Sequence, residues 1–266
     1  MNAPGRITFI GAGPGAADLI TLRGAARLRE ADVVLFDALT DPALRDLAPQ
    51  ARWINVGKRG FCDSTGQATI DALLVRMAQQ HQRVVRLKGG DPSVFGRLEE
   101  ELLALAAAGI ACEVVPGVTA ALAAAADTQR PLTRRGLGRS VSLTTAMTTA
   151  TAQQGALSAG RHADTEVFYM AGRQLGKLGR ALRAAGWPEG TSVSVVSRAG
   201  WPDSVASEHA LAELAAAAVL HAGRPAVVTV GAGAARLTPA LQPKAMANAM
   251  ATGAETTASG TPALAP

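Results

Sequence analysis

A glycine pair near the middle of the chain is the first candidate for a ligand-binding loop. Val84, Val85 and Leu87 form an apolar run typical of a buried strand, and residues 89–92 (Gly-Gly-Asp-Pro) follow it at once. Without a Cβ, paired glycines let a ligand lie directly against the backbone, and open α/β sheets bind ligands in loops that follow their strands. A plain tight turn between a strand and a helix explains the same residues, and spacing alone favours neither interpretation.

A second glycine cluster, residues 11–15 (Gly-Ala-Gly-Pro-Gly), has the form of a dinucleotide-binding loop. Asp37 ends the next strand-like run, where a ribose-binding acid would stand. Pro14 argues against this interpretation, because proline has no amide to donate to a pyrophosphate and it stiffens the loop. A dinucleotide would also leave residues 89–92 without a role, so a NAD-dependent oxidoreductase or nucleotide-binding module is the minority alternative.

Charged residues follow two further strand-like runs. Asp37 follows one of them, and Lys58 and Arg59 follow the other. If the sheet is parallel, all of them lie on the edge that carries the glycine loops. A carboxylate and an ammonium in one cleft would act as base and acid or would orient a charged substrate, whereas a solvated ion pair is the alternative without a functional role.

Other common chemistries find little support. The histidines are scattered, and neither they nor the cysteines form a metal-ligand cluster, so no metal site is predicted; these residues are His81, His162, His209, His221, Cys62 and Cys112. The chain has no Gly-x-Ser-x-Gly elbow and no Walker loop. Because these two cysteines are the only ones and are far apart, we expect a reducing compartment and no disulfide framework.

Length and composition predict a chain with an ample buried core, and an N-terminus without a signal-peptide pattern predicts a cytoplasmic protein. The chain has 266 residues, of which 48% are hydrophobic and 3% aromatic, so the core relies on small and aliphatic side chains. The net charge of +5 comes without a lysine and arginine block, and no run is long enough to span a membrane, so we expect neither a nucleic acid nor a membrane partner. Arginine far outnumbers lysine, which suits a polycarboxylate or phosphate ligand and equally a GC-rich genome.

The first half of the chain alternates strands and helices, which is typical of a mainly parallel α/β layer. Strands are expected at residues 7–10, 32–36, 53–56, 84–87 and 112–115. Helices are expected from Asp18, from Asp41-Pro42, at residues 67–80, at residues 98–108 and after Thr119.

A second set of elements follows a polar connection at residues 127–139. Strands are expected at residues 140–144, 166–170, 192–196 and 226–230, helices at 174–185 and 208–220, and a loop or frayed helix at 146–160. The pattern predicts one domain at residues 1–130, a second at 131–238, and a disordered tail at 239–266.

Taken together, these motifs resemble the tetrapyrrole methylases, from about Arg6 to Arg236. The resemblance is carried by residues 11–15, Asp-Ala-Leu at 37–39, Gly-Lys-Arg at 57–59, Arg-Leu-Lys-Gly-Gly-Asp-Pro-x-Val-Phe-Gly-Arg at 86–97, Val-Pro-Gly-Val-Thr-Ala at 115–120, Pro-Leu-Thr at 131–133 and Val-Phe-Tyr-Met at 167–170. Gly-Lys-Arg and Val-Phe-Tyr-Met favour the members that methylate uroporphyrinogen III over the later methylases of the cobalamin pathway.

The resemblance implies two α/β lobes with the active site in the cleft between them, S-adenosylmethionine as cofactor, S-adenosylhomocysteine as its product, and a homodimer. Asp37 and Lys58 take the position of the family's acid/base pair, and Arg59 and Arg97 that of substrate-binding residues. The family's cofactor contacts fall on Pro14, Gly89, Gly90, Asp91, Val94, Thr119, Ala120, Met170 and Ala199.

The implied reaction is the C-methylation of uroporphyrinogen III at two ring positions, which gives precorrin-2 for sirohaem or cobalamin. The chain departs from the family's pattern at Arg134, where histidine is usual, at Thr145-Ala146, where Gly-His is usual, and at Leu98-Glu99, where Gly-Gly is usual. Because these positions are expected near the substrate, another precorrin methyltransferase or a weakly active paralogue is the main alternative.

Overall fold

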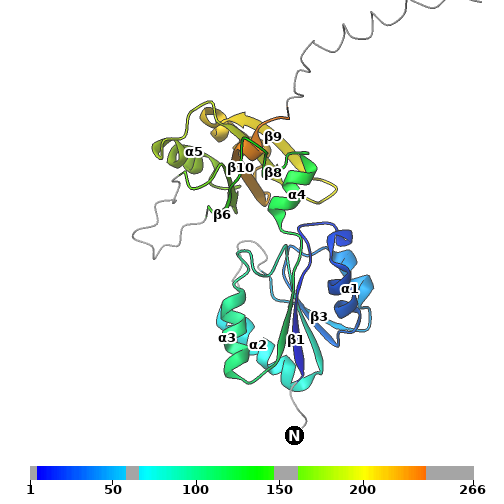
Figure 1. Cartoon of the computed structure of the whole chain (residues 1–266). Coiled ribbons are helices and arrows are strands. Elements are labelled where there is room, and N and C mark those ends of the chain that lie inside the picture. The colour runs from blue at the N-terminus through cyan, green and yellow to red at the C-terminus, as the bar shows by residue number, and fades with distance from the viewer. Residues whose placement is uncertain (1–4, 58–65, 147–160, 238–266) are drawn as a thin grey trace, which may run out of the picture. The chain divides into compact units, whose positions relative to one another are not determined.

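The computed structural model describes residues 5–57, 66–146 and 161–237, and within them the chain forms two five-stranded sheets (Figure 1). The predicted class of two α/β lobes is confirmed. The predicted loop at residues 146–160 and the predicted tail lie almost wholly outside the described residues.

The first sheet is entirely parallel, with the strand order β3-β2-β4-β1-β5, as the alternating pattern predicted. Its strands are β1 (Arg6–Gly11), β2 (Val33–Phe36), β3 (Arg52–Asn55), β4 (Arg83–Lys88) and β5 (Cys112–Val115). The central strands are nearly continuous runs of apolar β-formers because helices cover both faces of the sheet. Parallel pairing also brings every strand's carboxyl end to one edge, where the candidate loops lie.

Helices on the two faces divide the core of this sheet into two layers (Figure 1). On one face, α2 (Gln67–Gln80) and α3 (Leu98–Ala107) bury Leu74 and Leu105 against Phe9. On the other face, α1 (Leu22–Arg29) and the 3-10 helix η2 (Pro42–Leu47) pack with Val34 and Leu87.

Two predicted helix starts, at Asp18 and Asp41, belong to 3-10 helices in the structure. Asp18 does not begin the first helix: it lies in a short 3-10 turn, η1 (Ala17–Leu19), and α1 begins after Thr21, whose hydroxyl oxygen accepts from the Gly24 amide at 3.1 Å. Asp41 does cap an element, since its Oδ1 accepts from the Ala43 amide at 2.9 Å. That element is the 3-10 helix η2.

The second sheet is mixed, with the order β6-β7-β10-β8-β9. Only β6 and β7 pair in parallel; the other neighbours are antiparallel. Its strands are β6 (Val141–Thr145), β7 (Thr165–Tyr169), β8 (Ser192–Ser197), β9 (Val205–Ala210) and β10 (Ala226–Gly231).

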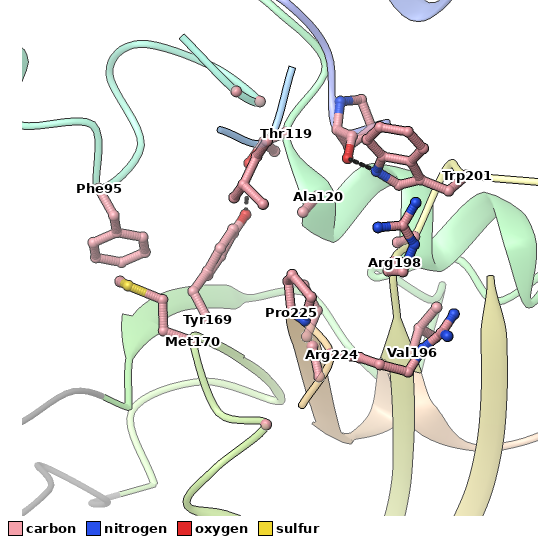
Figure 2. Close-up of a pocket in the computed structure, with 18 of the residues that line it drawn as sticks. Phe95, Thr119, Ala120, Tyr169, Met170, Val196, Arg198, Trp201, Arg224 and Pro225 are labelled. Atoms are coloured by element: carbon pink, nitrogen blue, oxygen red, sulfur yellow. Dashed lines mark hydrogen bonds between the residues drawn. The ribbon is translucent and has the colours of Figure 1, made fainter. Parts of the chain in front are cut away.

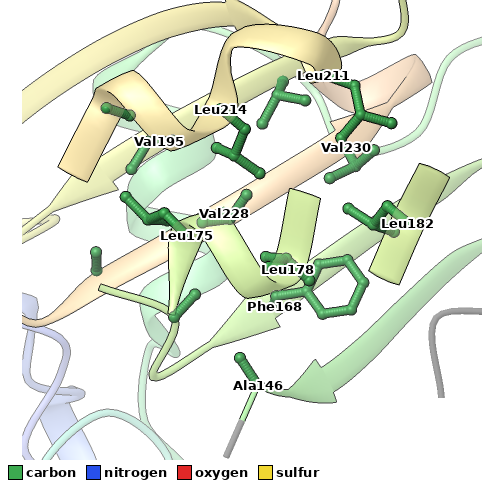
Figure 3. Close-up of a cluster of buried hydrophobic side chains, with 14 of the residues drawn as sticks. Ala146, Phe168, Leu175, Leu178, Leu182, Val195, Leu211, Leu214, Val228 and Val230 are labelled. Carbon is green, nitrogen blue, oxygen red and sulfur yellow. The ribbon is translucent and has the colours of Figure 1, made fainter. Parts of the chain in front are cut away.

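One face of this sheet carries a large apolar cluster, in which α5 (Leu175–Ala184), the 3-10 helix η3 (Leu211–Ala216) and α6 (Ala217–Leu220) cover the strands (Figure 3). Its members include Phe168, Leu178 and Val228, which are almost fully buried. Small alanines of α4 (Ala120–Asp127) pack on the other face against Val167 and Val196, so α4 shares its core with the second sheet. The division of the chain at residue 130 stays a prediction.

The predicted helix at residues 208–220 is wrong in its first part. Residues 205–210 form β9, an edge strand antiparallel to β8, and helical structure begins only at Leu211. The segment Val205 to Ala210 alternates half-buried and exposed positions, and backbone pairing with β8 outweighs the helical preference of its alanines.

Candidate active site

The two glycine loops meet at the carboxyl edge of the first sheet. The Gly90 amide donates to the Gly13 carbonyl at 2.7 Å, and the Gly13 amide donates to the Gly90 carbonyl at 3.3 Å. Both residues have positive φ, +82° at Gly13 and +71° at Gly90, which glycine adopts without strain. The loops after β1 and β4 therefore form one backbone platform.

A third loop, after β5, packs against this platform with no room for side chains. A Cβ on Gly117 would lie 2.3 Å from the Gly90 carbonyl oxygen and 2.7 Å from the Gly11 Cα. Asp91 holds the arrangement together: its Oδ2 accepts from the Gly117 amide and its Oδ1 from the Ser93 amide, each at 2.8 Å. Asp91 thus has a structural role whatever ligand binds above it.

A pocket of about 450 Å³ opens on this platform, and elements of both sheets line it (Figure 2). All the residues that the resemblance assigned to the cofactor line this one pocket: Pro14, Gly89, Gly90, Asp91, Val94, Thr119, Ala120, Met170 and Ala199. Its size and its apolar lining with a few polar groups are typical of a small-molecule site.

One wall of the pocket is aromatic. The rings of Phe95 and Tyr169 lie 5.0 Å apart, and the Tyr169 hydroxyl shares a hydrogen bond of 2.8 Å with the Thr119 hydroxyl (Figure 2). Burial raises the pKa of the Tyr169 phenol, so it stays protonated at neutral pH. This hydrogen bond joins the end of β7 to the residue that precedes α4.

The opposite side of the pocket is basic. The Arg198 guanidinium lies 4.3 Å from the centre of the Trp201 ring and pairs with Asp203, with which Arg224 also pairs. The Trp201 indole N–H donates to the Pro14 carbonyl at 3.1 Å (Figure 2). This bond ties the loop after β8 to the first glycine loop.

Behind this wall, a polar network holds Arg224. Its Nε donates at 3.1 Å to the Ser197 hydroxyl, which also bonds to Nδ1 of the fully buried His221 at 2.9 Å. Burial lowers the pKa of His221, so the ring is neutral at physiological pH and adds no further charge to this wall.

Strained backbone is concentrated around the pocket. Phe95, Arg97, Met170 and Arg198 all have φ between +52° and +57°, which is uncommon for residues with a Cβ. Phe95, Met170 and Arg198 line the pocket itself. Such conformations persist only where the surrounding structure over-determines them, and they cluster at functional sites.

Asp37 follows β2 on the same edge of the sheet but is not among the pocket-lining residues. Its side chain is 30% exposed, and its Oδ1 pairs with the buried Arg86 at 2.7 Å. A Cβ on Gly57 would lie 2.1 Å from the Ala38 amide nitrogen, so the loop that leads to Lys58 passes directly against the Asp37-Ala38 backbone. Lys58 and Arg59 themselves lie outside the described residues.

Arg97 also lies outside the pocket lining. It precedes α3, its side chain is 55% exposed, and it pairs with Glu100 at 2.6 Å, which raises the pKa of its guanidinium. Of the sequence departures, Leu98 and Glu99 form the first turn of α3, and Ala146 is buried in the core of the second sheet. Arg134 donates to the Ala235 carbonyl and does not line the pocket.

Several pocket residues were not predicted. Phe95 and Tyr169 lie inside motifs that the sequence already displayed, so their signal was present. Trp201, Arg198 and Arg224 follow strands of the second sheet or precede one, and no spacing in the sequence links them to Pro14 or Gly90. Only the tertiary fold brings these distant segments together.

The first glycine loop does not suit a dinucleotide. The amides of Ala12, Gly13 and Ala16 already donate to carbonyls of Lys88, Gly90 and Gly200, so they are not free for a pyrophosphate. Pro14 has no amide to offer. Among the described residues, no group of histidine, cysteine or carboxylate side chains could hold a metal ion, and no helix is both long and apolar enough to cross a membrane.

Comparison with known proteins identifies the family. Residues 6–215 match the model of the Tetrapyrrole (Corrin/Porphyrin) Methylases. The chain is 40% identical over 232 residues to uroporphyrinogen-III C-methyltransferase of Pseudomonas aeruginosa, covering 85% of this chain and 93% of that protein. It is 42% identical over 234 residues to siroheme synthase 1 of Yersinia pseudotuberculosis, which covers 86% of this chain but only 49% of that longer protein.

Solved structures agree with this assignment. Uroporphyrin-III C-methyltransferase of Thermus thermophilus, complexed with S-adenosylhomocysteine, superposes with a TM-score of 0.74 at 36% identity, over 85% of this chain and 97% of that one. A cobalt precorrin-4 methyltransferase superposes with a TM-score of 0.76 at 29% identity, over 87% of this chain and 96% of that one. The chain belongs to the tetrapyrrole methylase family.

Proposed function

We propose that this protein transfers methyl groups from S-adenosylmethionine to two ring carbons of uroporphyrinogen III and so produces precorrin-2. The observation that carries the proposal is the pocket on the joined glycine loops, which collects every residue assigned to the cofactor. The similar proteins from Pseudomonas aeruginosa and Thermus thermophilus bear the name of this activity.

The pocket suits a bent, partly apolar cofactor. Backbone groups around Gly89 and Gly90 form the floor, where a Cβ on Gly90 would meet nothing closer than the Thr119 Cα at 4.0 Å. That open space above a positive-φ glycine is a cradle a side chain would fill. Phe95, Tyr169 and Met170 provide an apolar wall against which a cationic sulfonium group is stable.

When bound, S-adenosylmethionine supplies an electrophilic methyl group on its sulfonium sulfur. The chain's own contribution is to align the substrate carbon with that methyl group, which is worth roughly 7–11 kcal/mol in favourable cases. The Asp37 carboxylate accepts or relays the proton that the methylated ring must lose, or accepts a hydrogen bond from a pyrrole N–H. Lys58 is the acid/base partner, and Arg59 and Arg97 pair with the acetate and propionate groups of the substrate.

The test combines binding with product analysis. Calorimetric titration should show S-adenosylhomocysteine binding, and anaerobic incubation with uroporphyrinogen III and S-adenosylmethionine should yield a doubly methylated product. Binding without this product would assign the protein to another substrate. Absence of binding, together with tight NAD binding, would establish the nucleotide-binding alternative instead.

A second candidate within the family is methylation of a later corrin precursor. The structural similarity to cobalt precorrin-4 methyltransferase and the substituted positions Leu98 and Glu99, next to Arg97, support it. A product methylated at a different position would favour this alternative. We also propose that the protein is a cytoplasmic homodimer, and sedimentation equilibrium of the purified protein would test the dimeric state.

A further inference from the structure

A buried strand of the first sheet, β4, carries two cations that the proposed reaction does not use. Arg86 and Lys88 are each 3% exposed and lie two residues apart on β4, so their side chains point to the same face of the sheet as Val84. That face is covered by α3, from which Glu101 enters, itself 0% exposed. Charged groups are rarely found so deep in a core unless they are paired.

These charges form one connected network. Glu101 accepts from Arg86 Nε through Oε1 at 3.1 Å and from Lys88 Nζ through Oε2 at 2.8 Å. Arg86 then reaches in the other direction, and its Nη2 donates to Asp37 Oδ1 at 2.7 Å. A second guanidinium nitrogen, Nη1, donates to the Leu87 carbonyl at 3.2 Å.

Asp37 is the only member of this four-residue network whose side chain is substantially exposed to solvent. Glu101, Arg86 and Lys88 are buried, while Asp37 is 30% exposed at the edge that carries the pocket. Within the described residues, no hydrogen bond reaches Asp37 Oδ2. One oxygen of Asp37 is therefore held from behind by the Arg86 guanidinium, and the other accepts no hydrogen bond from the part of the chain that the structure describes.

Stability alone does not account for this arrangement. Replacing a buried ion pair by well-packed apolar residues is often neutral or stabilising, because the desolvation of the charges offsets their attraction. Burial lowers the pKa of the Lys88 ammonium despite the neighbouring Glu101, which is the expected sign of that desolvation. A network with such a desolvation penalty is explained if its exposed end, the Asp37 carboxylate, must be held in a fixed orientation.

We propose that Glu101 and Arg86 are positioning residues for Asp37. Glu101, on α3, holds the guanidinium of Arg86, on β4, through one carboxylate oxygen. Lys88 binds the other oxygen of Glu101. Arg86 in turn fixes the orientation of the Asp37 carboxylate and keeps a cation beside it. The inference rests on the proposed role of Asp37 in the reaction, and it extends that role to residues that contact no substrate.

The first measurement does not depend on activity. Hydrogen exchange of the Arg86 Nε–H, followed by nitrogen-15 NMR and assigned by its loss in Arg86→Lys, should be slow in the wild type. Glu101→Gln should accelerate it at least about tenfold, because its neutral amide does not hold the guanidinium as the carboxylate does. Glu99→Gln, on the exposed first turn of the same helix, is the matched control and should leave the exchange unchanged. Unchanged exchange in Glu101→Gln would overturn the inference.

The second measurement is a double-mutant cycle on methyl transfer. Glu101→Gln should lower kcat about 100-fold through misplacement of Asp37, with the Kd of S-adenosylhomocysteine changed less than about threefold. In an Asp37→Asn background the same change should lower kcat less than about threefold further, because Glu101 acts through Asp37. Fully additive losses would mean a merely structural role and would overturn the inference.

Misfolding of Glu101→Gln and failure of the proposed function give different results. If Glu101→Gln does not fold, Arg86→Lys takes its place in the cycle, since a lysine ammonium lacks the fork that bridges both carboxylates. If the wild type neither binds S-adenosylhomocysteine nor methylates uroporphyrinogen III, the proposed function fails. The exchange measurement then decides by itself whether Glu101 holds Arg86.

Discussion

The two sheets contribute to the pocket in different ways. The first sheet contributes a backbone platform beside the Phe95 ring: its loops approach so closely that a Cβ on Gly117 would lie 2.3 Å from the Gly90 carbonyl oxygen. The second sheet presents side chains, among them Tyr169, Arg198 and Trp201. Backbone contacts at van der Waals distance allow no adjustment, whereas side chains can change rotamer. Changes on the first side should therefore be severe and changes on the second side graded.

The severest test is Gly90→Val. A β-branched side chain at φ +71° both strains the loop and fills the cradle, so we expect the Kd of S-adenosylhomocysteine to rise at least about 100-fold, equivalent to about 2.8 kcal/mol. Gly109→Val is the matched control, because Gly109 has φ +67° and a Cβ added there would meet nothing within 4 Å. The control should lose similar stability but keep its affinity. A Gly90→Val protein with normal affinity would contradict the assignment of this loop to the cofactor.

Asp37→Asn should separate chemistry from cofactor binding. Loss of the carboxylate is expected to lower the rate of methyl transfer by roughly 100-fold or more, as for general acid–base groups, because the amide accepts no proton. Affinity for S-adenosylhomocysteine should stay within about threefold, because Asp37 does not line the pocket. Asp32→Asn is the control. Asp32 lies just before β2, and this change breaks its 3.0 Å ion pair with Arg83. Equal losses in binding and transfer would reject this role for Asp37.

A graded effect is expected on the side of the second sheet. Tyr169→Phe removes the hydrogen bond to Thr119 but keeps the ring beside Phe95, so the Kd of S-adenosylhomocysteine should rise about three- to tenfold, matching a net contribution of roughly 0.5–1.5 kcal/mol. Thr119→Val should have a similar effect. The double variant should be no weaker than either single one. Losses as large as those in Gly90→Val would remove the distinction between the two sides.

The smallest effect concerns the pH dependence of stability. The pKa of Lys88 is lowered from 10.5, mainly by burial, so the unfolded chain binds more protons than the folded one between the lowered pKa and 10.5. The free energy of unfolding of the wild type, relative to Lys88→Met, should therefore rise as the pH increases through this window. Urea unfolding of both proteins over this range measures the difference. A difference that falls with pH would mean that the ion pair with Glu101 outweighs the desolvation.

Local patterns predicted most of the elements. The apolar runs of the first sheet and the helix at residues 67–80 were located within a residue or two. Strands buried on both faces are continuous apolar runs, and the helix has its apolar residues at helical spacing on one face. Residues 208–210 were misassigned to a helix, and residues 205–207 were not predicted as a strand, because a short edge strand of small and polar side chains carries no such signal. Only pairing with β8 decides its structure, and that pairing involves residues that the local window does not contain.

The candidate site divides in the same way. Glycine-rich loops after strands, and the motifs that resemble the family, named the residues proposed for the cofactor, and these residues line one pocket. Lys58 and Arg59 stay predictions, since they lie outside the described residues. The network behind Asp37 was not predicted, although two cations in an apolar strand were a visible anomaly. Glu101 sits 15 residues from Arg86 among other glutamates, and nothing local distinguishes it from Glu99.

The sequence by itself determined the strand and helix types, the position of the glycine loops and the family, because these depend on residue type and short-range spacing. Tertiary structure decided which loops share a backbone platform, which side of the pocket is aromatic and which is basic, and which glutamate is buried beneath Asp37. Those features depend on contacts between segments far apart in the chain, such as the bond from Trp201 to Pro14. Such contacts contribute to the free energy only after both sheets have folded.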